Sequence, residues 1–99
     1  MIMFSTRARI VGPIPDAMTW AHEIAGIVTK ISGVEVQVAA RVGGHSDVLW
    51  VTRLENMAAV EKLMDQLQAA PDYDASIRQA LAKGLFETHS IEQAFWRTA

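Results

Sequence analysis

The chain has 99 residues, of which 51% are apolar, and its 9 basic and 11 acidic side chains give a net charge of −2. This length fits one domain, residues 1–99, and the slight acidic excess argues against a general nucleic-acid binder. The chain has no cysteine, which excludes disulfides and thiolate chemistry. Its apolar runs are far shorter than a membrane span, and residues 1–7 do not read as a signal peptide. We therefore expect a cytoplasmic protein with no membrane or nucleic-acid partner.

Residues 4–11 alternate between apolar and polar side chains, which predicts a half-buried strand. Pro13 and Pro15 end this strand, because proline cannot donate a hydrogen bond to a sheet. A helix follows, with Asp16 as the candidate N-cap and Gly33 as the predicted stop. Its apolar residues recur at helical spacing and form one stripe: Ala17, Trp20, Ile24, Ile27, Val28 and Ile31.

Residues 34–42 alternate strictly and carry valines on one face, which predicts a second strand. The glycine-rich loop 43–47 joins it as a hairpin to a third strand, residues 48–54. This third strand is apolar at both parities, with Val48, Trp50, Thr52 and Leu54 on one face and Leu49, Val51 and Arg53 on the other. A strand of this kind needs both faces covered, and the helices of so short a chain can cover one. We therefore expect a homodimer, in which a second copy covers the other face.

Asn56 is the candidate cap of the next helix, whose apolar stripe is Met57, Val60, Leu63, Met64 and Leu67. Pro71 interrupts this helix, and Asp74 is the candidate cap of a further helical segment that ends near Gly84. Residues 90–98 alternate again and predict a last strand, with a continued helix as the competing interpretation. The order β-α-β-β-α-β predicts a ferredoxin-like α+β subunit with an antiparallel sheet.

Two residues are candidates for catalysis. His89 precedes the last strand and Tyr73 follows the helix break, so each could transfer a proton or donate a hydrogen bond at a cavity. The competing interpretation is an exposed histidine and a tyrosine that packs on the helix turn. No pair of histidines has metal-binding spacing, so we predict neither a metal site nor a cofactor.

Four arginines could share the open face of the sheet: Arg7, Arg9, Arg41 and Arg53. Together they could attract a carboxylate or a phosphate, or they could pair with Glu35 or with acidic residues of a second copy. Trp50 could stack against a bound molecule, or it could belong to the core. These four arginines and Trp50 are the candidate ligand-binding residues.

A family resemblance rests on the stretch 50–56, in which the strand is followed by an acid, on the alanine-rich helix after it, and on the break Ala70-Pro71-Asp72-Tyr73. Leu85-Phe86 then precedes the last strand. In these features the chain resembles the dimeric α+β barrel superfamily, which includes the antibiotic-biosynthesis monooxygenase (ABM) and NIPSNAP-type domains. The resemblance covers nearly the whole chain. It implies two sheets packed face to face across a dimer, with a ligand-sized cavity between each sheet and its helices or inside the barrel.

The resemblance implies two classes of function. One is a dimer that binds a small hydrophobic or anionic molecule, and the other is a cofactor-independent monooxygenase or isomerase. Haem-degrading members resemble one another in an asparagine on the first strand and a histidine on the second helix. This chain has neither in residues 4–11 or 57–68, so haem degradation is not expected. A purely structural or partner-docking role would instead show a sheet face packed solid, without a cavity.

Overall fold

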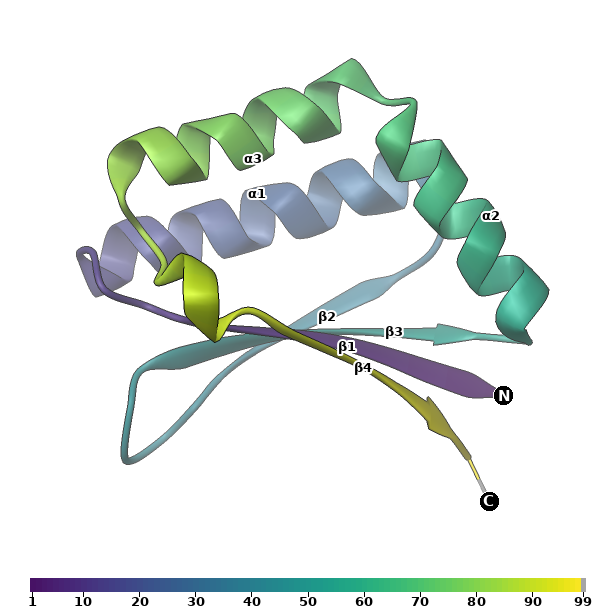
Figure 1. Cartoon of the computed structure of the whole chain (residues 1–99), viewed down its shortest axis with the longest axis horizontal. Coiled ribbons are helices and arrows are strands. Elements are labelled where there is room, and N and C mark those ends of the chain that lie inside the picture. The colour runs from purple at the N-terminus through teal and green to yellow at the C-terminus, as the bar shows by residue number, and fades with distance from the viewer. Residues whose placement is uncertain (99) are drawn as a thin grey trace.

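The computed structural model describes residues 1–98 and shows one sheet with helices on one of its faces (Figure 1). Its elements are β1 (Ile2–Arg9), α1 (Ile14–Ser32), β2 (Val36–Ala40), β3 (Asp47–Leu54), α2 (Met57–Gln68), α3 (Pro71–Lys83), the 3-10 turn η1 (Thr88–Ser90) and β4 (Glu92–Arg97). The strands pair antiparallel in the order β2-β3-β1-β4. The predicted ferredoxin-like α+β class is therefore confirmed, with the second helical region divided in two.

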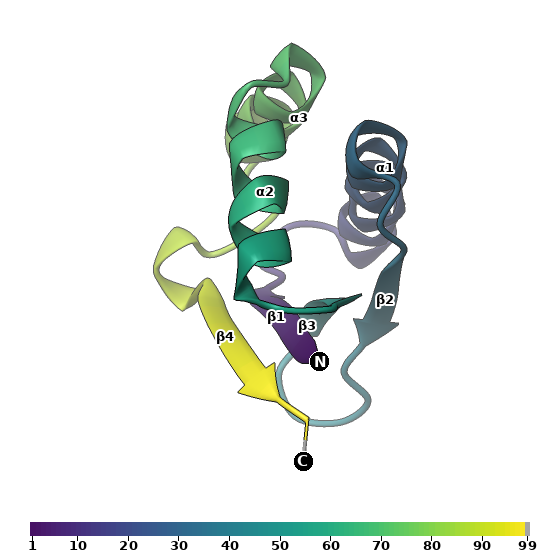
Figure 2. The same cartoon turned by 90° about the vertical axis from the view of Figure 1, so that its right-hand side faces the viewer.

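The sheet has a helix-covered face and an open face, and the parity of β3 decides which residues lie on each. Val48, Thr52 and Leu54 are buried under the helices. Leu49 and Val51 lie on the opposite face and are half-buried within the sheet. Figure 2 shows all the helices on one side of the strands. The expectation that the chain covers one face of this strand and leaves the other open is confirmed.

The first helix begins earlier than predicted. It starts at Ile14 with Pro13 as N-cap and Pro15 in the first turn, and no side chain caps it. The prediction that Asp16 is the N-cap was wrong. Proline is favoured in the first turn of a helix, where its missing N–H would have no partner, so Pro15 belongs to the helix and the N-cap lies before it. Asp16 lies in the first turn, where its negative charge interacts favourably with the positive end of the helix dipole.

The third helix shows the same effect. Pro71 is its first residue, Ala70 is its N-cap, and Asp74 lies inside it rather than at its start. Pro71 therefore separates α2 from α3 as predicted and also begins α3. The prediction that Asp74 caps this segment was wrong for the same reason as at Asp16.

The other helix boundaries agree with the sequence signals. The side chain of Asn56 accepts a hydrogen bond from the backbone N–H of Ala59 at 2.9 Å and so caps α2. Gly33 and Gly84 end α1 and α3 in the left-handed conformation, with φ of 75° and 61°, which glycine adopts without steric cost.

All four predicted strands are present with changed bounds. The first covers residues 2–9 rather than 4–11, and the third begins at Asp47 rather than Val48. Residues 92–97 form β4, so the helical alternative for the end of the chain is wrong. The second strand covers residues 36–40 rather than 34–42, because its pairing with β3 ends at Ala40, where the hairpin begins. Val42 is consequently 99% exposed.

The core under the helices consists of two clusters. One joins α1 to β3 and the start of the last loop, and includes Trp20, Val48 and Leu85. The other joins β1 to α2, and includes Phe4 and Leu63. In residues 1–98 no helix is long and apolar enough to cross a membrane.

Candidate ligand cavity and the charged hollow

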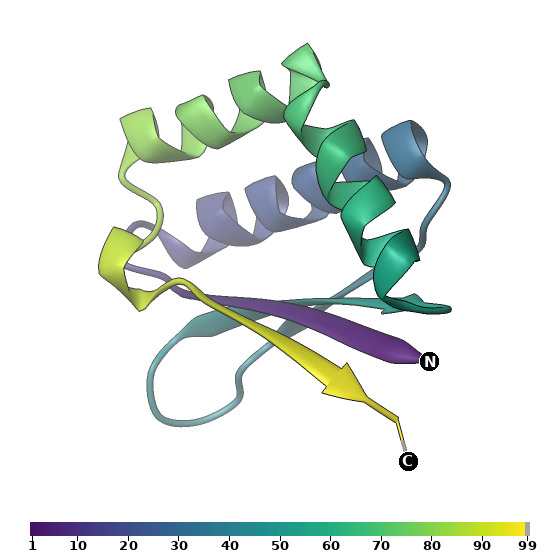
Figure 3. The same ribbon diagram turned by 45° about the vertical axis from the view of Figure 1, so that its right-hand side comes forward.

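A cavity of about 290 Å³ lies between the helix-covered face of the sheet and the helices. The cavity exists because α3 packs against α1 and α2 and does not pack on the strands. Figure 3 shows α3 raised above the sheet, beyond the bend at Pro71. Leu81 and Ile91 line the cavity and are 58% and 50% exposed, so the cavity opens to solvent between α3 and β4.

One end of the cavity is an aromatic cluster. Trp20, Trp50 and Phe86 meet with ring centroids between 5.3 and 6.0 Å apart, at steep angles to one another, which is a favourable arrangement for aromatic rings. Trp20 Nε1 donates to the Ser76 carbonyl at 2.9 Å, and Trp50 Nε1 donates to the Ala21 carbonyl at 3.1 Å. Both indole N–H groups are therefore already bonded. Trp50 both lines the cavity and packs against the core.

The described lining is mostly apolar and carries a few polar residues: Thr6, Thr52, Tyr73, Thr88 and Gln93. The hydroxyl oxygen of Thr52 is buried and has no hydrogen-bond partner within residues 1–98. An unpaired buried hydroxyl is unfavourable, so this group lowers the stability of the fold. The sequence could not indicate this group, because its surroundings depend on strand register and helix placement.

Tyr73 is the one ionisable residue among the described residues that line the cavity. It lies in the first turn of α3 and is half-buried. Burial raises the pKa of its phenol above the ordinary value of 10.0, because the charged phenolate is disfavoured away from water. At neutral pH, Tyr73 is therefore a protonated phenol that can donate a hydrogen bond.

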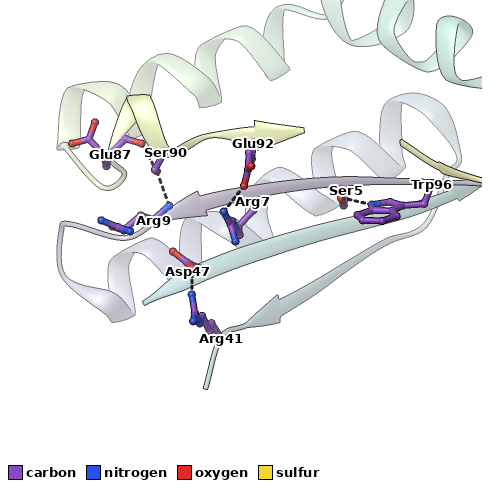
Figure 4. A network of polar contacts seen from close by, with 9 residues as sticks. All are labelled: Ser5, Arg7, Arg9, Arg41, Asp47, Glu87, Ser90, Glu92 and Trp96. Atoms are coloured by element: carbon purple, nitrogen blue, oxygen red, sulfur yellow. Dashed lines mark hydrogen bonds and ion pairs between the residues drawn. The ribbon is translucent and has the colours of Figure 1, made fainter. Parts of the chain in front are cut away.

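The predicted arginines lie on the other side of the sheet. Arg7, Arg9 and Arg41 line a second hollow of about 300 Å³ together with Asp47, His89, Ser90 and Glu92, and we call this group the charged hollow. Figure 4 shows most of its residues, at the end of the sheet where β1 ends and β3 begins. On β1, Phe4, Thr6 and Ala8 line the cavity, and alternation sends the arginines to the open face.

The predicted site residues are thus divided between two places. Trp50 and Tyr73 line the cavity, whereas His89 joins Arg7, Arg9 and Arg41 in the charged hollow. Arg53 lines neither and donates to Gln37 Oε1 at 3.0 Å. Within the described part of the chain, no three His, Asp or Glu side chains gather to hold a metal ion.

The fold is similar to those of solved NIPSNAP domain proteins and of a cofactor-independent oxygenase. An uncharacterised NIPSNAP domain protein from Burkholderia xenovorans superposes with a TM-score of 0.80 at 17% identity, over 100% of this chain and 95% of the other. A NIPSNAP family protein from Agrobacterium tumefaciens has a TM-score of 0.80 at 17% identity, over 99% and 92% of the two chains.

SnoaB, a cofactor-independent oxygenase from Streptomyces nogalater, has a TM-score of 0.74 at 11% identity, over 99% of this chain and 92% of its own. No family model matches the sequence. No curated protein matches it either. The resemblance predicted from sequence is therefore confirmed as a likeness of fold, which by itself does not define a function.

The unpaired hydroxyl of Thr52 generates a stability prediction. Thr52→Val removes the hydroxyl and keeps the shape of the side chain, so it should raise the free energy of unfolding by about 1 kcal/mol. Thr29→Val is the matched control, because the Thr29 hydroxyl donates to the Val34 carbonyl at 2.8 Å and its loss should lower stability. Urea denaturation measures both. A Thr52→Val protein that is less stable than wild type would show that the hydroxyl has a partner in solution.

The burial of Tyr73 generates a pH prediction. The chain has one tyrosine, so an ultraviolet absorbance titration reports Tyr73 alone, and its midpoint should lie above 10.0. Since the folded pKa is the higher one, the folded state holds this proton more tightly. The associated stability is complete below about pH 10 and is lost as the pH rises through the folded pKa. The same titration in urea should return to the ordinary value, and equal midpoints in both conditions would contradict the burial of the phenol.

Proposed function

We propose that the protein binds a small, uncharged and largely apolar molecule in the cavity between its sheet and its helices. The observation that carries this proposal is the described lining, which is apolar and aromatic with a few polar groups and no charged side chain. Small-molecule sites commonly have this composition, and their volumes begin near 300 Å³.

The lining also defines which chemistry the cavity favours. A charged group placed there would lose its hydration without gaining an ionic partner, which is costly. The Tyr73 phenol can donate a hydrogen bond to a carbonyl or ether oxygen, and the lining also carries the polar side chains of Thr6, Thr88 and Gln93. These groups would orient the molecule, while the aromatic cluster would supply most of its contact surface.

A cofactor-independent oxygenase or isomerase is the second candidate, supported by the likeness of fold to SnoaB. In this case Tyr73 would act as a hydrogen-bond donor rather than a base, because its raised pKa keeps the phenol protonated at neutral pH. Such a donor stabilises a negative charge that develops on a substrate oxygen. Binding without turnover needs none of this chemistry, and it is the function that the cavity supports best.

The protein would act as a homodimer that is joined through the open face of the sheet. Leu49 and Val51 are half-buried on this face, and Trp96, which pairs across from Met3 on the same face, is 55% exposed. Covering these apolar side chains with an identical sheet would bury them on both subunits at once, which is a favourable source of association energy.

Ligand binding is tested by filling the cavity. Ile77 lines the cavity from α3, so Ile77→Trp should place an indole in the space and weaken binding of the neutral probe N-phenyl-1-naphthylamine by about tenfold or more. Ala75→Trp adds the same side chain at an exposed position of α3 and should leave binding unchanged. The probe's fluorescence gives the affinity. Failure of the wild-type protein to bind, or an equal effect of both variants, would overturn the proposal.

The assembly is tested by a charge on the open face. Val51→Asp would bury a carboxylate between the two sheets, at a cost of several kcal/mol, and should convert the dimer to monomers with unchanged helix content. Sedimentation velocity and circular dichroism measure the two quantities. Ala58→Asp, at an exposed position of α2, should leave the dimer intact. A wild-type monomer, or a Val51→Asp dimer, would argue against this interface.

A further inference from the structure

The charged hollow lies on the opposite side of the sheet from the apolar cavity, and its composition is the reverse of the cavity's. Its described lining is polar, with three arginines, two acids, a histidine and a serine drawn from β1, the β2–β3 hairpin, η1 and β4. Residues from three separate stretches of the chain, 7–9, 41–47 and 89–92, therefore meet in one place, and no apolar side chain is among them.

Two of the arginines are held by acids. Arg41 Nη1 lies 3.2 Å from Asp47 Oδ2, and the Asp47 side chain is only 9% exposed. Arg7 pairs with Glu92 on the neighbouring strand (Figure 4). These pairs fix the positions of two guanidinium groups and use only part of their hydrogen-bonding capacity, because each guanidinium has five N–H donors.

Arg9 differs from the other two, because its guanidinium has no acidic partner within 4.0 Å in residues 1–98. Among the lining residues, three arginines therefore face two carboxylates. A third carboxylate, Glu87, lies beside the hollow, where its Oε1 accepts a hydrogen bond from the His89 N–H at 2.9 Å, and it forms no ion pair with Arg9. A concave site with an excess of one sign attracts ions of the opposite sign.

The backbone around Arg9 is held independently of its side chain. The Ser90 hydroxyl accepts a hydrogen bond from the Arg9 N–H at 2.9 Å and donates to the Glu87 carbonyl at 2.6 Å. The Glu87 N–H donates to the Arg9 carbonyl at 2.9 Å. Ser90 therefore joins η1 to the end of β1, and the donors left for a ligand are the arginine side chains and His89.

We propose that the charged hollow is a second binding site, for the carboxylate or phosphate group of a small molecule. Arg9 would provide a guanidinium that no acid pairs, and the free N–H groups of Arg7 and Arg41 would add charge-assisted hydrogen bonds, which are stronger than neutral ones. The acid pairs hold two of the three guanidinium groups in place before the anion arrives, so less side-chain entropy is lost on binding. This site takes an anion, whereas the cavity takes an uncharged molecule. The hollow lies on the face through which the proposed homodimer is joined, because Arg7 pairs across from Leu49, so in the dimer the anion would lie at the contact between the two copies.

The test is the binding of inorganic phosphate and of acetate to the intact protein. Isothermal titration at constant ionic strength, with chloride replaced by the probe, separates specific binding from screening. We expect saturable binding of at least one probe, and the tighter probe identifies the group that the site prefers. Arg9→Gln should reduce that affinity about tenfold, while the backbone bonds to Ser90 and Glu87 persist.

Arg53→Gln is the matched control, because Arg53 is an exposed arginine of the neighbouring strand β3 that lies outside the hollow. It should leave anion affinity within about twofold of wild type. The absence of saturable binding, or an equal loss in both variants, would overturn the proposal. A change in dimer dissociation by Arg9→Gln without any anion binding would also overturn it, and would assign the hollow to contacts with the second copy.

The outcome is independent of the proposed ligand in the cavity. Arg9→Gln should still bind N-phenyl-1-naphthylamine as wild type does, because the cavity lies on the other face of the sheet. Loss of probe binding in Ile77→Trp with intact anion binding would confirm that the two sites are separate. Failure of one proposal is therefore measured in a different assay from failure of the other.

Discussion

The constraint on which this structure depends is the position of β3 in the interior of a sheet that has helices on one face only. Its neighbours β1 and β2 satisfy its backbone, and its side chains are apolar in both directions. The helices bury Val48, Thr52 and Leu54, whereas Leu49 and Val51 remain on the open face. All three α-helices of residues 1–98 lie on the other face of the sheet (Figure 2). The fold therefore leads to an assembly hypothesis, because a second copy that covered Leu49 and Val51 would bury apolar surface that is half-exposed on the open face.

The cavity follows from a second local feature, the break between α2 and α3. Pro71 ends one helix and begins the next, so α2 can pack its buried residues near the sheet while α3 turns away to lie on α1. A single straight helix would have only one line of contact with the strands. The two core clusters then close the space at its ends, and the volume between them stays open to a ligand.

The sheet also separates two kinds of chemistry. Successive residues of β1 point to opposite faces, so Phe4, Thr6 and Ala8 contribute to an apolar cavity while Arg7 and Arg9 contribute to a charged hollow. One strand thus serves two sites of opposite polarity. The segment after α3 does the same, since Thr88 and Ile91 line the cavity and His89 and Ser90 line the hollow. An uncharged ligand and an anion would therefore be bound on opposite sides of the same four strands.

The sequence by itself determined the secondary structure and the class of fold, because these depend on local periodicity and on capping residues such as Asn56, Gly33 and Gly84. It missed the helix starts at Ile14 and Pro71. Proline can end a strand or helix and can also occupy the first turn of a helix, and the sequence alone does not distinguish these two roles. It also predicted Arg7, Arg9, Arg41, Trp50 and Tyr73 as candidate site residues, but it did not show which of them lie together. Only the tertiary structure decided that. Strand register brings Arg7 to Glu92, and helix packing brings Tyr73 to the same cavity as Thr52. These residues are far apart in the sequence, so local periodicity could not predict that they lie together.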